Sequence, residues 1–288
     1  MTTVDYRPAI AKRIAELPPF SPVLNKLVAS LANDNISFLE IGKLIEQDTV
    51  LAGHVLRMVN SAAYNLRSTV TSISYGVSIL GIDKLRNMAL AISVSRMWSA
   101  LKPAPGWSAA RFNQHSLATA LLADGLAMNL RVNYPEGAFL AGLMHDLGKV
   151  VVANGLPAEY AEIASQHQRT GAPWISCESN VLGLDHASIS AIALEQWKVP
   201  EPICRAARMH HYPELVTSDG IPLSRAVRVA SDAATTLGYP VLEAGPVPDP
   251  AAAEQQVREA IDELGGKGQG TLVLAAFLPE FEAIRTLS

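Results

Sequence analysis

Histidine and aspartate side chains carry most of the chemistry that this chain could perform. Residues 138–153 read AFLAGLMHDLGKVVVA, and the only polar side chains in that segment are His145, Asp146 and Lys149. A helix that is apolar on every face belongs in a core, where an ionised carboxylate is costly unless a cation or strong donors compensate it. We therefore expect a partner, with a metal ion as the main candidate, beside the His145–Asp146 pair.

Further candidate ligands lie on separate segments of the chain: His115, His186, His210, His211 and Asp232. His186 follows Asp185, which is a favourable N-cap, so the imidazole belongs to the first turn of a helix. Five imidazoles and two carboxylates suit one or two first-row divalent ions, with bonds of about 2.0–2.2 Å. The residues thus predict a site for iron, manganese, nickel or zinc that holds one or two ions.

Simpler interpretations exist for the same residues. Lys149 stands one helical turn after Asp146 and could be its salt-bridge partner, and Arg228 stands four residues before Asp232 and could form a surface ion pair with it. The histidines could also form a structural network without an ion. His54 and His167 have no comparable setting, so we interpret both as structural or solvated. The joint occurrence of an embedded His–Asp pair, a His–His pair and further inward candidates favours a metal.

The segments that must position these side chains have helical periodicity almost throughout, which predicts an all-α, two-lobed helical bundle. Ser37 is expected to cap a helix that reaches Gln47, and Gly81 is expected to separate two helices. We expect an N-terminal helical lobe over residues 1–101, a second helical lobe with the metal site over 102–240, and a Pro-rich connector with C-terminal helices over 241–288. The expected helices span about 23–32, 37–47, 49–62, 73–80, 82–98, 109–130, 138–153, 158–170, 174–182, 186–197, 202–211, 222–237 and 251–264, with a last one after 270.

Composition narrows the class of protein. The chain has 288 residues, is 49% hydrophobic and 17% charged, and has a net charge of −4. That balance argues against bulk nucleic-acid binding. Two cysteines are too few for a disulfide framework, the first residues lack a secretory pattern, and no apolar stretch reaches about 18 residues. We expect a cytoplasmic protein without a membrane span.

The order of the candidate ligands resembles that of the HD superfamily of metal-dependent phosphohydrolases, and the run from His145 to Lys149, HDLGK, is similar to the HD-GYP signature. Three further segments narrow the resemblance: CESNVLGLDHAS at 177–188, WKVPEPI at 197–203 and HHYP at 210–213 resemble the HDOD family, the HD-related output domain of bacterial signalling proteins. In the first lobe LPPFSP at 17–22, VLAGHVLRMVNSAAY at 50–64 and ISYGVSILG at 73–81 agree with it.

This resemblance implies a bacterial signal-transduction output protein with an HD-type metal site, acting on a regulatory protein partner or a nucleotide-like ligand. HDOD domains are generally regarded as lacking demonstrated hydrolase activity. The alternative is a metal-dependent phosphohydrolase of a nucleotide or other phosphate ester, in which Asp146 would bridge the ions and Lys149 would stabilise charge on phosphoryl oxygens. The Gly-Tyr-Pro element associated with cyclic-di-GMP hydrolysis is absent after the histidine pair, which argues against that substrate.

Overall fold

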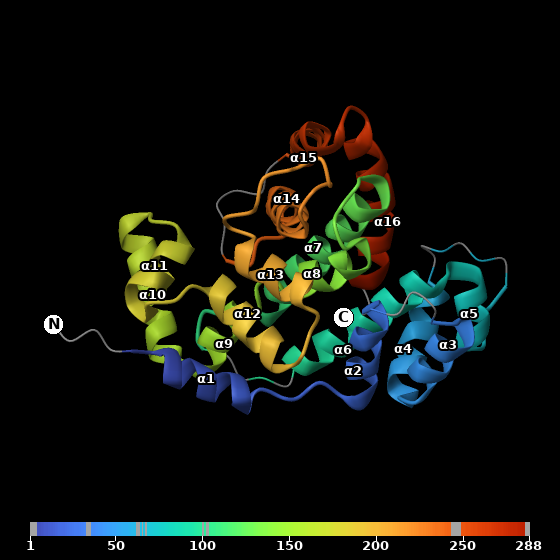
Figure 1. Cartoon of the computed structure of the whole chain (residues 1–288), viewed down its shortest axis with the longest axis horizontal. Coiled ribbons are helices and arrows are strands. Elements are labelled where there is room, and N and C mark those ends of the chain that lie inside the picture. Colours follow the sequence, from blue (N-terminus) through green and yellow to red (C-terminus); the bar gives the residue numbers. More distant parts are fainter. Residues whose placement is uncertain are drawn as a thin grey trace.

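The computed structural model describes residues 5–32, 36–61, 64, 66, 68–99, 101, 104–242 and 249–285. Throughout these residues the regular structure is helical, with two isolated β-bridges, Val132 with Ile221 and Thr217 with Gly220 (Figure 1). The expectation of an all-α chain is confirmed.

The N-terminal helices form a group at one end of the molecule (Figure 1), except that α1 runs beneath the other end and packs on α9. Their bounds are α1 (Arg7–Glu16), α2 (Pro22–Ala29), α3 (Phe38–Glu46), α4 (Thr49–Val59), α5 (Ile73–Leu80) and α6 (Ile82–Ser99). Ser37 caps α3 in a reciprocal capping box with Glu40, as its sequence position predicts. Gly81 separates α5 from α6 with φ of 87°, a conformation that favours glycine.

The helices that carry the candidate ligands follow: α7 (Ala109–Asn129), α8 (Ala138–Met144), α9 (Leu147–Gly155), α10 (Pro157–Thr170), α11 (Trp174–Leu182), α12 (His186–Gln196), α13 (Glu201–Met209) and α14 (Leu223–Thr236). Two C-terminal helices, α15 (Pro250–Gly265) and α16 (Gln269–Arg285), complete the chain, and α16 packs along α7. Residues 102–103 of the expected lobe boundary and 243–248 of the expected connector lie outside the described residues.

One connected apolar core runs through the molecule. It extends from Ile10 in α1 to Phe281 in α16 without interruption. Helix α6 contacts α2 to α5 on one side and α7 and α8 on the other. The ring of Trp197, which follows α12, lies 4.5 Å from the ring of Phe20 and 6.4 Å from that of Trp98. The division of the chain after residue 101 stays a prediction, because the apolar core is shared by both parts.

The expected single helix over residues 138–153 is wrong in one respect. Helix α8 ends at Met144 and α9 begins at Leu147, so His145 and Asp146 form the junction between two helices. Asp146 has φ of −99° and ψ of 11°, which lies outside the α-helical region. Within a continuous helix, adjacent residues would point about 100° apart around the axis. The junction instead lets both side chains face one centre.

Two glycines allow the helices around this junction to approach closely. A Cβ atom at Gly142 in α8 would lie 2.8 Å from the backbone oxygen of Thr119 in α7. A Cβ atom at Gly148 in α9 would lie 2.1 Å from the backbone oxygen of His186 in α12. The Oγ of Ser190 ties the same two helices together, because it accepts a hydrogen bond from Gly148 N at 2.7 Å and donates one to His186 O at 2.8 Å. The two contacts fix the spacing of the helices that bear the histidines.

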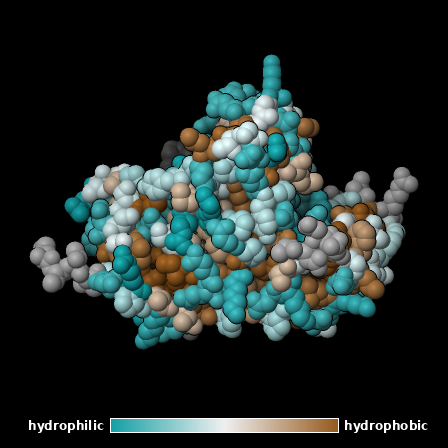
Figure 2. Space-filling view, in the orientation of Figure 1, coloured by the Kyte–Doolittle hydropathy of each residue, from teal (hydrophilic) through white to brown (hydrophobic). Residues whose placement is uncertain are grey.

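The outer surface mixes polar and apolar residues. Figure 2 shows apolar residues gathered along the lower half of one face, interrupted by hydrophilic ones. Large apolar side chains such as Phe38, Leu39 and Val50 are more than half exposed on α3 and α4. Among the described helices, none has both the length and the apolar character that crossing a bilayer requires.

Substitution of Gly148 tests the close approach of α9 and α12. We expect Gly148→Ala to lower the free energy of unfolding by about 1–3 kcal/mol, because the added methyl group meets the backbone rather than a side chain that can move. Gly53 in α4 is the matched control, since nothing lies within 4 Å of a Cβ atom there. Gly53→Ala should stabilise the protein by about 0.5–1 kcal/mol. Urea denaturation measures both changes, and equal effects of the two substitutions would contradict the assigned spacing.

Candidate metal centre

A buried carboxylate, that of Asp146, lies at the centre of the candidate site. Its Oδ1 is 3.2 Å from Nε2 of His186 and 3.7 Å from Nε2 of His210. Its Oδ2 is 3.5 Å from Nε2 of His145 and 3.7 Å from Nε2 of His115. All five side chains are 3% exposed or less. Four imidazoles from α7, α12 and the ends of α8 and α13 therefore direct the same ring nitrogen at one carboxylate.

The opposite ring nitrogen of each of these histidines has its own acceptor. The Nδ1 atoms donate to backbone oxygens in three cases: His115 to Tyr239 at 2.8 Å, His145 to Gly142 at 2.8 Å and His210 to Ala207 at 2.7 Å. A carbonyl oxygen can only accept, so each of these rings carries a proton on Nδ1. When these rings are neutral, the Nε2 lone pairs therefore face Asp146. This is the usual orientation of histidines that bind a metal through Nε2.

His186 is oriented by a side chain rather than by the backbone. Its Nδ1 lies 2.5 Å from Oε2 of Glu178, which also accepts a hydrogen bond from the His186 backbone nitrogen at 2.9 Å. The other oxygen of Glu178 accepts a hydrogen bond from Nε1 of Trp174 at 2.7 Å. Glu178 is 1% exposed, so its charge is buried with these partners. A carboxylate behind a histidine both fixes the ring and makes it a stronger ligand.

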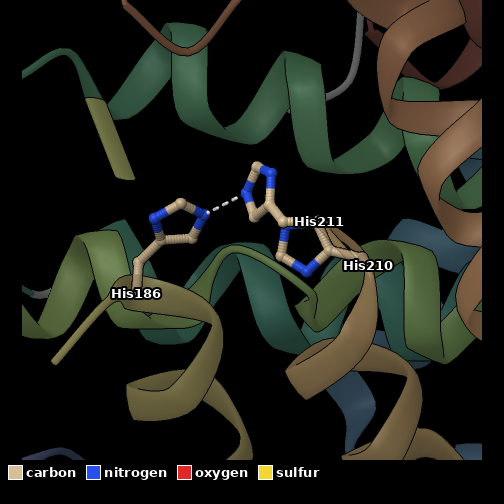
Figure 3. Close-up of side chains that lie close together, drawn as sticks. All are labelled: His186, His210 and His211. Atoms are coloured by element: carbon tan, nitrogen blue, oxygen red, sulfur yellow. Dashed lines mark hydrogen bonds between the residues drawn. The ribbon is translucent and has the colours of Figure 1, made fainter. Parts of the chain in front are cut away.

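His211 adds a fifth imidazole on one side of the cluster. Its Nε2 lies 2.8 Å from Nε2 of His186, and Figure 3 shows the two rings turned toward each other with His210 beside them. At that distance the two nitrogens cannot both carry a proton, so at least one lone pair lies between the rings. Two adjacent nitrogens in octahedral coordination, each about 2.1 Å from the ion, lie about 3.0 Å apart. The observed spacing fits that arrangement.

The donor atoms divide into two neighbouring groups. His186, His210 and His211 form one, and His115, His145 and Asp146 form the other, with the donor atoms of each group within 4.8 Å of one another. Asp146 belongs to the second group and contacts His186 and His210 of the first. Each group could therefore hold an ion, and Asp146 contacts residues of both groups.

Two buried atoms at the centre lack an aligned hydrogen bond. They are Nε2 of His145 and Oδ1 of Asp146. A buried polar atom without a partner costs free energy, and native proteins avoid it unless an ion or a ligand supplies the interaction. These two atoms, together with the Nδ1 contacts behind them, fit a first-row divalent ion bound by nitrogen and oxygen.

Burial and mutual charge set the protonation of the cluster. Burial lowers the pKa of His115 and of His211 to about 3, and it also lowers the pKa values of His145 and His210. Burial opposes ionisation of Asp146, but the adjacent side chains of His145, Lys149 and His186 hold its pKa well below the usual value. Neutral imidazoles beside an ionised carboxylate are the forms that bind a metal.

His186 is the exception in the protein without an ion. Burial disfavours its charged form, but the buried carboxylate of Glu178 and the nearby carboxylate of Asp146 raise its pKa to about 9. A bound ion would have to displace this proton, since a ligating nitrogen needs its lone pair.

Lys149 makes the contact that its spacing predicts. Its Nζ lies 2.6 Å from Oδ2 of Asp146, and its side chain is 13% exposed. Part of the charge of Asp146 is therefore compensated within the protein, as the simpler interpretation of the sequence proposes. Oδ1 stays on the side of the carboxylate that faces His186 and His210.

The structure does not bring Asp232 to the cluster. Its side chain is 60% exposed, and its Oδ2 accepts a hydrogen bond from Nε of Arg228 at 2.5 Å. The neighbouring residue on α14 faces the site instead, because Oγ of Ser231 lies 3.3 Å from Nε2 of His115. One residue along a helix changes direction by about 100°, so Ser231 and Asp232 cannot both face inward. The surface ion pair accounts for Asp232.

Arg228 links the cluster to the surface. Its Nη1 lies 3.3 Å from Nδ1 of His211. Of the two histidines expected outside the site, His167 binds the backbone oxygen of Ala172 through Nδ1 at 2.8 Å. His54 lies on α4, away from the cluster.

Sequence reasoning did not identify Glu178 or Ser231 as members of the site. Glu178 carries a recognisable signal, because it lies between the buried Cys177 and Leu182 on a mostly apolar helix and four residues after Trp174. Such a carboxylate needs a buried partner. Ser231 carries no comparable signal, since its role depends on the rotation of α14 against α7.

The raised pKa of His186 predicts how the stability of the metal-free protein depends on pH. A group whose pKa is raised by folding stabilises the protein fully below its unfolded pKa, near 6.5, and this contribution is lost as the pH rises through about 9. The melting temperature of chelator-treated protein should therefore fall between pH 7 and pH 9. Glu178→Gln removes the main charge that raises this pKa, so its melting temperature should change less over the same range. Parallel curves for the two proteins would contradict the assignment.

Comparison with known proteins places the chain in a family. The model of the HDOD domain matches residues 17–213. An HDOD domain protein of unknown function from Geobacter sulfurreducens has a similar structure, with 21% identity, a TM-score of 0.76 and coverage of 97% of this chain and 95% of that one. A protein from Shewanella amazonensis SB2B, provisionally described as a phosphohydrolase, has 23% identity, a TM-score of 0.74 and coverage of 97% of both chains.

An uncharacterised protein of Treponema pallidum is 26% identical over 210 residues. The match covers 73% of this chain and 40% of that protein, so the chain corresponds to less than half of the length of this relative. The structural likenesses establish a shared fold, and the family model covers helices α2 to α6 as well as the helices that carry His115, the His145–Asp146 pair and the His210–His211 pair. The chain belongs to the HDOD domain family.

Proposed function

We propose that the histidine–aspartate cluster binds one or two first-row divalent ions, and that the protein is a cytoplasmic bacterial signalling output module whose ligand or partner acts through this site. One observation carries the proposal. Four buried imidazoles direct Nε2 at the carboxylate of Asp146, while the Nδ1 of each is held by an acceptor behind it. Unrelated core histidines have no reason to share this orientation.

The two groups of donor atoms define which residues would hold an ion. His186, His210 and His211 would hold one, and His115, His145 and Asp146 would hold another or complete the first. Iron, manganese, nickel and zinc all accept this mixture of nitrogen and oxygen. A bound ion would supply a Lewis acid that polarises a phosphoryl oxygen or lowers the pKa of a water molecule.

The charge of the site indicates what kind of ligand it would attract. Asp146 and Glu178 are buried carboxylates at the cluster, while Lys149 adds a positive charge beside Asp146. The combined positive charge of one divalent ion and Lys149 therefore exceeds the negative charge of the two carboxylates. A second ion would increase this excess. A net positive charge in a buried site favours an anionic ligand. This supports a nucleotide or another phosphate-bearing molecule as the regulatory ligand.

A second candidate function is phosphate-ester hydrolysis. The presence of two neighbouring donor groups favours it, because two ions can hold both the attacking and the leaving oxygen of a phosphoryl transfer. Lys149 lies where it could stabilise charge on a phosphoryl oxygen. One observation argues against hydrolysis. Helix α14 presents the hydroxyl of Ser231 to the cluster rather than a carboxylate, so Asp146 is the one carboxylate in the two donor groups.

Metal analysis of purified variants tests the proposed site. The metal content is measured first in protein purified without added metal. It is measured again after incubation with each candidate ion and desalting. We expect the protein to retain a near-stoichiometric amount of at least one of these ions. Asp146→Asn and His145→Ala should lose that metal, because each removes a central donor atom. His167→Ala is the matched control, since this histidine binds a backbone oxygen outside the cluster. Equal metal content in Asp146→Asn and the wild type, with circular dichroism showing folded protein, would contradict the proposal.

Turnover assays separate the two candidate functions. Metal-loaded protein is incubated with phosphomonoesters, phosphodiesters and nucleotides. We expect bound metal without turnover, together with a rise in melting temperature in the presence of a nucleotide. Turnover that requires the metal and disappears in Asp146→Asn would establish the hydrolase instead.

A further inference from the structure

A cavity of about 290 Å³ lies between the N-terminal helices and the helices of the histidine cluster. It is lined by residues of α4, α6, α7 and α8. Its volume is just below the usual range for small-molecule sites, about 300–1,000 Å³, which limits a ligand to a small molecule. The cavity shares α7 and α8 with the cluster but none of the cluster's ligands.

The charged residues in the wall of this cavity are cationic. Arg57 and Arg96 both line it, and no carboxylate is among the described residues of the wall. Burial lowers the pKa of the third titratable wall residue, His54, and the charges of Arg57 and Arg96 lower it further. Arg96 is paired with Asp48 at 3.0 Å on the surface, whereas Arg57 is exposed at the end of the cavity wall formed by α4. The positive potential therefore extends over the cavity and is only partly balanced by Asp48.

The cavity wall also contains buried polar groups without a partner. Oγ of Ser116 and Nε1 of Trp98 are both buried, and neither has a hydrogen-bond partner in the part of the chain that the structure describes. Ser116 is 2% exposed and Trp98 is 4% exposed. An indole nitrogen can only donate, and a hydroxyl donates readily, so both groups need an acceptor. A ligand in the cavity that carries an acceptor could supply the partner that each of these donors needs.

The rest of the wall is apolar. Met58, Ile92, Leu117 and Leu143 contribute buried side chains from four different helices. Apolar walls with a few converging polar groups are typical of sites for small organic molecules, in which the walls supply affinity and the polar groups supply orientation. The described wall has hydrogen-bond donors and arginines but no carboxylate, so it favours a ligand with a negatively charged group over one with a positively charged group.

We propose that this cavity binds a small amphipathic anion, with an apolar chain against Met58, Ile92, Leu117 and Leu143 and a carboxylate or phosphate head that accepts hydrogen bonds from the donors of the wall. None of the proposed metal ligands lines this cavity. Two wall residues are nevertheless close in sequence to the cluster, because Ser116 follows His115 and Leu143 precedes His145 by two residues.

Binding is measured with octanoate, octyl phosphate and octylammonium as probes of equal chain length. Two-dimensional NMR of the 15N-labelled full chain resolves the indole signals of its four tryptophans, and a Trp98→Phe variant assigns the one in the cavity. We expect octanoate or octyl phosphate to shift the Trp98 signal in a saturable way, with little change at Trp107 and Trp174, and octylammonium to have little effect. The relative affinities of the two anions identify the preferred head group. Absence of a saturable Trp98 shift with both anions, or an equal response to octylammonium, would overturn the proposal.

A charge variant tests the role of the arginine. Arg57→Gln should weaken anion binding by about two- to fivefold, the range for an exposed charge pair. Arg169→Gln makes the same change of net charge on an exposed position of α10, away from the cavity, and should leave the affinity unchanged. Equal effects of the two substitutions would show a general charge effect and contradict a site at Arg57.

A second variant separates binding from stability. Ser116→Ala removes the unpartnered buried hydroxyl without adding any atom, so the melting temperature of the free protein should change little. Anion binding should nevertheless weaken by about five- to tenfold, because the variant lacks the donor. A lower melting temperature with unchanged affinity would mean that the hydroxyl has a structural role, and would overturn its place in the site.

Discussion

The carboxylate of Asp146 is the constraint on which the rest of the structure depends. It lies in an apolar core with 1% exposure, and a charge in that position requires compensation from its surroundings. Lys149 supplies a direct ion pair, and four imidazoles surround the remaining edge. Because burial keeps most of these imidazoles neutral, the cluster has donor atoms in the form that a metal needs.

The helices are arranged to bring those side chains to one point. His145 and His210 each follow the last turn of a helix and bind a backbone oxygen three residues earlier, which uses a carbonyl that the helix end leaves free. The close contacts at Gly142 and Gly148 set the distances from α8 to α7 and from α9 to α12. The packing of α7 and α8 against α6 also encloses the cavity, so His115 in α7 belongs to the cluster and the next residue, Ser116, to the cavity wall.

Much of the fold could be predicted from local patterns. The helical class, the cap at Ser37, the break at Gly81 and the start of α12 at His186 depend on periodicity and on a few residues near each end, and the structure agrees with each of them. The break between α8 and α9 could not be predicted in this way. The segment around His145 and Asp146 is apolar on both sides and has a normal helical composition, so nothing local marks the junction.

The sequence by itself determined which residue types were available to the site: an embedded His–Asp pair, a His–His pair and further histidines in apolar settings, which no surface role explains. Only the tertiary structure decided which of them meet. It brings His115, His186, His210 and His211 to Asp146, adds Glu178 and Ser231, and leaves Asp232 with Arg228 at the surface. The physical reason is rotation. A helix turns about 100° per residue, so whether Ser231 or Asp232 faces the cluster depends on how α14 packs against its neighbours, which local sequence does not specify.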